Sequence, residues 1–168
     1  MRSIAGILFA LVLPCALAAD DAHQVSKELQ ALRGTWKAVS IEAKGNLLPK
    51  ERVPDFKFII ADEGKATSKS PYGDYQATIT VDPGKSPKTL DNLHVTGAQK
   101  GKKQYGIYQL DGDTWTVCMT PPGVAEASRP QDFSSKNNAN AVFVFKRLKK
   151  DEKELNADRD ETTPKGAQ

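Results

Sequence analysis

Two alternating segments joined by a tight turn constrain this chain more than any other feature. They run from Tyr105 to Met119 and meet at Asp111-Gly112. Asp-Gly between alternating apolar runs is a strong hairpin signal, because glycine accepts the positive φ of a primed turn. Since side chains alternate between the two faces of a strand, one face of the hairpin carries Tyr108, Leu110, Trp115, Val117 and Met119. This aromatic face requires a larger sheet to bury it.

Six further segments have the alternation or the bounding turn residues of strands. They are Thr35–Ala43, Phe56–Ile60, Lys65–Ser70, Tyr75–Val81, Thr89–Thr96 and Ala141–Leu148. Before them, Ala22–Leu32 has apolar residues at helical spacing, and Gly34 follows where a helix cap is expected. Eight short strands and one helix predict an all-β fold, either an antiparallel sandwich or a closed barrel. At eight strands, a barrel interior either fills with side chains or holds one small ligand.

Composition divides the chain into four segments. Residues 1–18 resemble a secretory signal peptide, with Arg2, an apolar run and an Ala-Leu-Ala cleavage site. We expect a short helix over 19–33, a barrel domain over 34–148, and a charged tail over 149–168 that has too few apolar side chains to order itself. The signal predicts an exported protein, periplasmic or extracellular, without stable membrane insertion after cleavage.

Two other interpretations of the N-terminus are less favoured. A retained anchor is disfavoured because the apolar run Ile4–Val12 is too short to span a bilayer. Lipid attachment at Cys15 is disfavoured because Pro14 stands where lipoprotein signals carry a small residue. Removal of the signal peptide leaves Cys118 as the single cysteine, so no intramolecular disulfide can form.

Charge and motifs argue against several function classes. Lys and Arg number 24 against 21 Asp and Glu, and no basic stripe with interleaved aromatic residues occurs, so nucleic acid is not an expected partner. The two histidines, His23 and His94, lack the spacing of a zinc site, and neither G-x-S-x-G nor H-E-x-x-H is present. We therefore expect no enzyme activity, no metal and no cofactor, while any protein partner stays unknown.

Two residues with reactive side chains have structural interpretations. His94 alternates with Leu93 and Val95, which predicts that its imidazole faces solvent. Cys118 lies in the middle of a predicted strand, away from any expected cation or helix N-terminus. This position favours a packed structural thiol over a nucleophile.

Several motifs resemble a known family. Gly34-Thr35-Trp36 is similar to the G-x-W signature of lipocalins and other calycins. A longer set resembles an uncharacterised, exported lipocalin-like domain of planctomycete-type bacteria: Val81-Asp82-Pro83, Pro87 to Asp91, Gly106 to Thr114, Cys118, Arg129-Pro130 with Phe133, and Lys146-Arg147. The resemblance implies an eight-stranded antiparallel up-and-down barrel, closed where Arg147 packs over Trp36. It implies no activity, and Trp115 departs from the family, which usually has a smaller aliphatic residue there.

Side-chain parity gives the residues that would contact a ligand inside such a barrel. The inward set is Phe56, Phe58, Tyr75, Ile79, Tyr108, Leu110, Trp115, Val117, Phe143 and Phe145. Tyr75, Tyr108 and Trp115 would supply the polar groups that orient a small apolar or amphipathic molecule. The alternative is that these residues form the core of a filled barrel, in a structural or protein-interaction module of the cell envelope. The interior volume separates the two.

The longest predicted loop precedes the last strand and carries Arg129, Pro130 and Phe133. We expect it to fold back over the barrel, with Arg129 paired to Asp113 or Asp91 and Phe133 filling an apolar gap. The alternative is a lid over a ligand opening, because long loops often carry binding residues.

Overall fold

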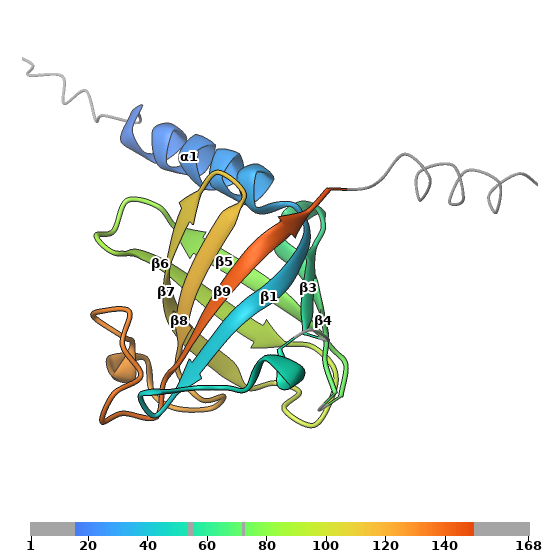
Figure 1. Ribbon diagram of the computed structural model, residues 1–168. Helices are drawn as coiled ribbons and strands as arrows, with labels where there is room; N and C mark the ends of the chain where they lie inside the picture. The colour runs from blue at the N-terminus through green and yellow to red at the C-terminus, as the bar shows by residue number, and fades with distance from the viewer. Residues whose placement is uncertain (1–15, 54–55, 72, 150–168) are drawn as a thin grey trace, which may run out of the picture.

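Eight antiparallel strands close into a barrel, and one helix lies across one of its ends (Figure 1). The computed structural model describes residues 16–53, 56–71 and 73–149. The predicted charged tail beyond Lys149 and most of the predicted signal peptide lie outside these ranges. The elements are α1 (Ala16–Leu32), β1 (Gly34–Ala43), β2 (Asn46–Leu47), β3 (Lys57–Ile60), β4 (Lys65–Lys69), β5 (Tyr75–Asp82), β6 (Lys88–His94), β7 (Lys103–Asp111), β8 (Thr114–Met119) and β9 (Ala141–Leu148), with single 3-10 turns at Lys50–Arg52, Asp62–Gly64 and Glu126–Ser128.

The barrel closes because β9 returns to pair with β1. From β3 onward each strand pairs with the next one in sequence, and the two-residue strand β2 only extends one end of β1. The closing ladder runs from Thr35↔Leu148 to Ala43↔Ala141, with one irregularity in β1 beside Val39. Closure leaves the wall without a free strand edge. The prediction of eight antiparallel strands in a closed barrel is confirmed, and the sandwich alternative is wrong.

The predicted hairpin forms β7 and β8. Asp111 pairs with Thr114, so the turn itself consists of Gly112 and Asp113. Gly112 has a φ of 54°, and glycine at the first of two turn positions fits a type II′ turn, whose twist matches that of the flanking strands. Trp115 is 2 % exposed, so the aromatic face of the hairpin points into the barrel as its alternation predicts.

Helix α1 covers one end of the barrel. Leu32 is fully buried there, and its carbonyl accepts a hydrogen bond of 2.7 Å from Trp36 Nε1. Glu28 also pairs with Lys88 at the start of β6, with 2.7 Å between Oε1 and Nζ. The helix begins earlier than predicted, at Ala16, in a stretch of Ala and Leu that favours helix. No helix in the described ranges is both long enough and apolar enough to cross a bilayer.

Aromatic side chains fill the part of the barrel nearer to α1. The ring centroids of Trp36 and Trp115 are 5.6 Å apart, and Trp115 stacks on Phe145 at 5.0 Å. Phe58 approaches Trp115 from another wall at 5.7 Å. Burial of such rings is the main favourable contribution to folding, at roughly 1.5–3 kcal/mol for each large apolar side chain. This part of the interior is therefore a packed core.

The long connection between β8 and β9 packs against the outside of the barrel. Its Phe133 covers a second apolar cluster formed by Ile107, Cys118 and Val142 on β7, β8 and β9. These three side chains alternate with the inward ones, so they are on the outer face of the wall and are buried only because the loop covers them.

Candidate functional site

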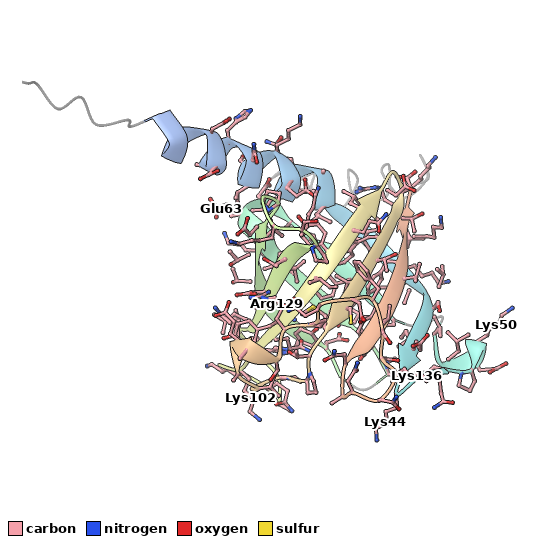
Figure 2. All side chains as sticks on the ribbon, turned by 90° about the vertical axis from the view of Figure 1, so that its left-hand side faces the viewer. Lys44, Lys50, Glu63, Lys102, Arg129 and Lys136 are labelled. Carbon is pink, nitrogen blue, oxygen red and sulfur yellow. The ribbon has the colours of Figure 1, made fainter. Side chains whose placement is uncertain are left out.

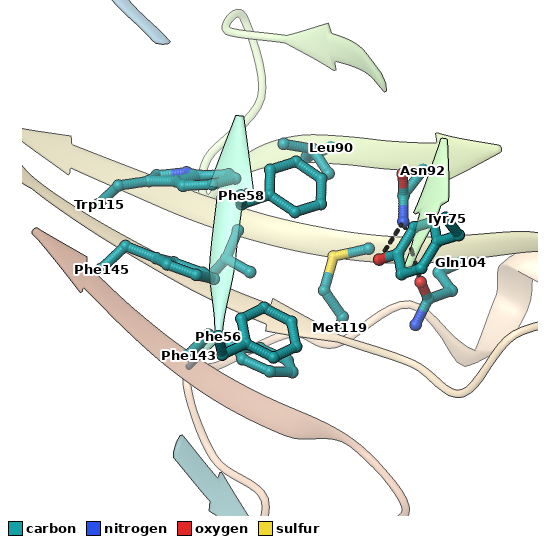
Figure 3. A pocket seen from close by; sticks show the side chains of 11 residues that line it. Phe56, Phe58, Tyr75, Leu90, Asn92, Gln104, Trp115, Met119, Phe143 and Phe145 are labelled. Atoms are coloured by element: carbon teal, nitrogen blue, oxygen red, sulfur yellow. Dashed lines mark hydrogen bonds between the residues drawn. The ribbon is translucent and has the colours of Figure 1, made fainter. Parts of the chain in front are cut away.

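A small cavity lies inside the barrel, toward the end opposite α1, and Figure 3 shows the side chains that line it. Its volume is about 60 Å³. Most of its walls come from the strand ends remote from the helix, so it opens toward that end. The lining residues are Phe56, Phe58, Tyr75, Leu90, Asn92, Gln104, Trp115, Val117, Met119, Phe143 and Phe145.

The structure places seven of the ten predicted ligand-contact residues in this lining: Phe56, Phe58, Tyr75, Trp115, Val117, Phe143 and Phe145. The other three are not among the cavity residues. Ile79 and Tyr108 are buried in the core, and Leu110 packs at its margin. Parity places all three inward, but parity does not say how deep a residue lies along the barrel axis. They face inward as predicted but do not line this cavity, so their role as ligand contacts stays a prediction.

Most of the lining is aromatic. The rings of Phe56 and Phe143 are 5.5 Å apart, and Phe143 stacks on Phe145 at 5.9 Å with an interplanar angle of 14°. Met119 approaches from the end of β8 (Figure 3). An apolar guest would thus contact rings on one side and a thioether on another.

The opposite wall is polar and is built mainly by β6 and β7. Asn92 Nδ2 donates to Gln104 Oε1 at 3.0 Å, and Gln104 Nε2 donates to the Thr120 carbonyl at 2.9 Å. His94 Nε2 lies 2.8 Å from the same Gln104 oxygen, so that nitrogen carries the proton, because an amide oxygen only accepts. Tyr75 stacks on the imidazole at 4.3 Å, and its hydroxyl lies 3.5 Å from Asn92 Nδ2.

The prediction that His94 faces solvent is wrong, since its side chain is 5 % exposed. Strand β6 turns Leu90, Asn92 and His94 inward, while Leu93 and Val95 are 39 % and 42 % exposed. The apolar side chains at this end of the strand thus face outward. Alternation identifies two faces of a strand but not which one is inner, so the polar wall could not be predicted from the sequence pattern.

Two buried atoms of the polar wall have no hydrogen-bond partner among the described residues. They are Asn92 Oδ1, on a side chain that is 3 % exposed, and His94 Nδ1. The first is an amide oxygen, which can only accept a hydrogen bond. Leaving a buried polar group unpaired costs roughly 1–3 kcal/mol. A guest that brings a donor to Asn92 would therefore be stabilised.

The lining carries no ionised side chain near neutral pH. Burial raises the pKa of Tyr75 above its ordinary value, and hydrogen bonds with Ser68 and Asn92 offset part of that rise. The phenol therefore stays protonated, and the other lining residues have no titratable group. Such a cavity suits the binding of a neutral polar group better than it suits acid–base chemistry.

The barrel is closed by a cluster beneath the C-terminal end of α1. The Arg147 guanidinium lies 4.1 Å from the centre of the Trp36 ring, and it donates to the carbonyls of Ala31, at 2.7 Å, and Arg33. Its Nε pairs with Asp113 at 3.0 Å. A cation at a helix C-terminus is also favoured by the helix dipole. Asp113 belongs to this closure cluster, so its prediction as a loop anchor is wrong.

Arg129 is held on the outer wall of β6 and β7 instead, by Asp91. Its Nη2 pairs with Asp91 at 2.7 Å, its Nη1 donates to the Gly106 carbonyl at 3.0 Å, and its guanidinium lies 5.1 Å from the centre of the Tyr105 ring. Burial alone would lower the pKa of Arg129, but hydrogen bonds to Asp91 and Glu126 raise it. These contacts hold the loop against the wall and not across the cavity opening.

Cys118 lies outside the cavity, beneath the same loop. Its thiol is fully buried and contacts the Ser134 carbonyl at 3.8 Å. Burial, with the nearby charge of Asp132, raises the pKa of Cys118 to about 11. A thiol that is un-ionised at neutral pH is a poor nucleophile. In the part of the chain that the structure describes, no group of His, Cys, Asp and Glu is placed to hold a metal ion.

In comparisons with known proteins, no family model and no curated protein matches this chain. The cavity itself combines a mostly aromatic lining with a wall of hydrogen-bonded amide side chains.

Proposed function

We propose that this protein is an exported, non-enzymatic, lipocalin-like up-and-down barrel that binds a small amphipathic molecule in the cavity opposite α1. One observation carries the proposal. Asn92 Oδ1 is a buried acceptor with no described hydrogen-bond partner, and the rest of the lining is mostly aromatic. The lipocalin-like part is supported by the sequential strand order and by Arg147 over Trp36.

The guest has an apolar body and a hydroxyl or amine donor at one end. Its donor would meet Asn92 Oδ1, while its apolar body would lie against Phe56, Phe143 and Met119. Because the lining is neutral, a charged end group would lose its hydration without gaining a counterion. A charged end therefore stays outside, at the mouth.

The volume of the cavity limits the size of the guest. A water molecule occupies about 30 Å³ in the liquid, whereas pockets for drug-sized ligands measure roughly 300–1,000 Å³. A cavity of about 60 Å³ holds a molecule of a few atoms, or one end of a longer molecule whose remainder lies beyond the mouth.

A pair of isomers tests the proposal. 1-Hexanol has an O–H donor, and methyl pentyl ether has the same atoms without one. We expect calorimetric titration to show 1-hexanol binding about 2–13-fold more tightly, the net worth of one hydrogen bond of about 0.5–1.5 kcal/mol. Asn92→Leu should abolish the difference, and Leu93→Asn on the outer face of β6 is the matched control. Equal binding of the isomers by the parent would contradict the role of Asn92.

A second candidate function is favoured by the small cavity volume. Under this second candidate, the barrel is a structural or protein-interaction module with a filled interior and no ligand. This candidate predicts that neither isomer binds, and that mass spectrometry of extracts from natively purified protein finds no small molecule.

Export is tested separately at the N-terminus. Cleavage after Ala18 predicts a mature chain that begins at Ala19 or Asp20. Mass analysis of the protein from its native host would identify the mature N-terminus. Recovery of intact Met1 or of a lipid-modified Cys15 would contradict a soluble exported protein.

A further inference from the structure

The end of the barrel that holds the cavity opening is rich in lysine. Its strand ends and connections carry seven exposed lysines: Lys44, Lys50, Lys57, Lys69, Lys100, Lys102 and Lys136. Figure 2 shows Lys44, Lys50, Lys102 and Lys136 together at this end, with α1 at the other. These lysines come from strand ends and from four different connections. They are therefore brought to one end by the barrel fold and do not belong to a single basic segment of the sequence. We call them the mouth lysines.

The mouth lysines have no ion-pair partner among the described residues, whereas several cations at the α1 end are paired. Near the helix, for example, Lys88 pairs with Glu28 and Arg147 with Asp113. At the mouth end, ion pairs are formed by Lys103, with Asp91 at 3.4 Å, and by Arg129. Among the residues that the structure describes at this end, the exposed carboxylates are fewer than the lysines: Glu51, Asp74 and Asp132, with Glu126 paired to Arg129. The mouth therefore carries an excess of uncompensated positive charge.

An exposed apolar side chain stands within this charged end. Leu47 in β2 is 69 % exposed, more than the other large apolar side chains that the structure describes as exposed, and lies between Lys44 and Lys50 in sequence. Its turn is anchored, because Gly45 N donates to Ser135 Oγ at 2.9 Å. A β-carbon at Gly45 would lie 3.5 Å from Lys136 Cα, which brings a lysine of the distant loop beside the same turn. Leu47 thus follows an anchored turn that carries Lys44 and lies beside Lys136.

We propose that the mouth end is a docking surface for an anionic phospholipid bilayer, with the mouth lysines on the headgroups and Leu47 in the interface. Basic side chains near an anionic leaflet gain from its surface potential, and apolar side chains beside them add area buried at the headgroup boundary. A soluble polyanion would satisfy the lysines but would leave Leu47 in water. Docking of this kind is peripheral and needs no membrane-spanning segment. It also sets the cavity opening against the bilayer, independently of whether the cavity binds a guest.

Flotation of the full chain with vesicles tests the docking. Vesicles of 70 % phosphatidylcholine and 30 % phosphatidylglycerol should retain the protein at 50 mM NaCl and release it at 500 mM, because salt screens the attraction. Vesicles of phosphatidylcholine alone should not retain it. All variants keep the same N-terminus, so any contribution of residues 1–18 is common to them. Equal retention on both vesicle types would overturn the proposal.

Matched charge reversals locate the surface. Lys44→Glu with Lys136→Glu should weaken binding at least 25-fold, since each lysine near an anionic bilayer is worth about fivefold. Lys27→Glu with Lys85→Glu, two exposed lysines near the other end, changes the net charge equally and should weaken binding less than about threefold. Equal losses in the two double variants would mean attraction by net charge alone and would overturn the proposal.

A label at Leu47 tests the apolar contact. In a chain that also carries Cys15→Ser, Leu47→Cys can be labelled selectively with an environment-sensitive fluorophore, because Cys118 is fully buried. On the anionic vesicles the emission should shift to the blue and gain intensity. The same label on Val39→Cys, a position 49 % exposed midway along β1, should not respond. Retention on vesicles without a response at Leu47 would reveal a purely electrostatic contact and would likewise overturn the proposal.

Discussion

Arg147 connects the barrel seam, the helix and the hairpin turn through one side chain. It covers the Trp36 ring, donates to two carbonyls at the end of α1 and pairs with Asp113. We expect Arg147→Ala to lower the free energy of unfolding by about 2–3 kcal/mol, because a cation–π contact is worth ~0.5–2 kcal/mol and each lost hydrogen bond adds to it. Denaturant unfolding measures the loss.

Arg147→Lys is the informative control. Lysine keeps the positive charge over Trp36 but lacks the planar fork that reaches carbonyls and carboxylate together. It should therefore recover only part of the stability. Full recovery would mean that the charge alone matters and that the contacts to α1 are incidental.

The raised pKa of Cys118 makes a prediction about alkaline stability. The folded thiol ionises at about pH 11, and the unfolded thiol near ~8.5. Between these values the unfolded chain binds fewer protons, so this contribution to stability is complete below the unfolded pKa and is lost as the pH rises through the folded pKa. The maximal loss is of the order of 3 kcal/mol.

Unfolding curves of the parent and Cys118→Ala between pH 8 and 11 check this. Tyr75 and Tyr108 also have raised pKa values, but both proteins retain them, so only the difference in slope reports on the thiol. The parent should lose stability more steeply. Parallel curves would show that the Cys118 thiol does not titrate differently in the two states.

Among the elements, the inner faces of β7 and β8 were predictable, whereas β6 was predicted as a strand but with the wrong inner face. In the hairpin, alternation, aromatic content and the turn glycine all agree, so Trp115 and its neighbours were assigned to the inner face correctly. In β6 the inner face holds Asn92 and His94 while Leu93 and Val95 face outward. The pairing of Asn92 and His94 with Gln104 on the next strand makes this arrangement stable. Such partners become visible only once the strands are in register.

Arg129 holds the first part of the connection between β8 and β9 against the outer wall, and Arg129→Ala should release it there. The change leaves the Asp91 carboxylate, 20 % exposed, with only Lys103, and we expect a loss of about 2–3 kcal/mol. Hydrogen exchange should rise over residues 121–140 and stay unchanged in β3 to β5. Lys103→Ala removes the more exposed cation of the same carboxylate and should cost less than ~1 kcal/mol.

Exchange that rises throughout the barrel in Arg129→Ala would contradict a local anchor. It would mean that the loop is part of the cooperative core, through Phe133 on its outer cluster.

At the scale of the whole molecule, the two ends of the barrel differ. One end is covered by α1 and closed by ion pairs, and the other has the cavity, the mouth lysines and exposed Leu47 (Figures 1 and 2). The sequence predicted which strands exist and, for most of them, which face is inner. It did not predict how far along the barrel axis Ile79, Tyr108 and Leu110 lie, nor the size of the cavity. Those depend on where α1 docks and on how side-chain volumes add up inside a barrel of this radius.

Trp115 decides how far the interior is filled. Its ring is 2 % exposed and contacts Trp36, Phe58 and Phe145, yet one edge lines the cavity. In a packed core, Trp115→Ala should lower the free energy of unfolding by ~3–5 kcal/mol. Leu93→Ala, at an exposed position of β6, is the control and should stay within ~0.5 kcal/mol of the parent.

The cavity left by Trp115→Ala has nearly the shape of indole, so added indole should bind it and restore stability. At a concentration 100-fold above its dissociation constant, indole would return about 2.7 kcal/mol. A filled barrel thus predicts a large loss that indole rescues in the variant and no effect of indole on the parent. A hollow barrel predicts a clearly smaller loss and binding of indole by the parent itself, since the ring would then be only a wall. Trp115 contacts three aromatic neighbours, and the free space beside them is only about 60 Å³. We therefore expect the large loss of stability that indole rescues. Any guest would then be confined to the side of the Trp115 ring that faces the mouth.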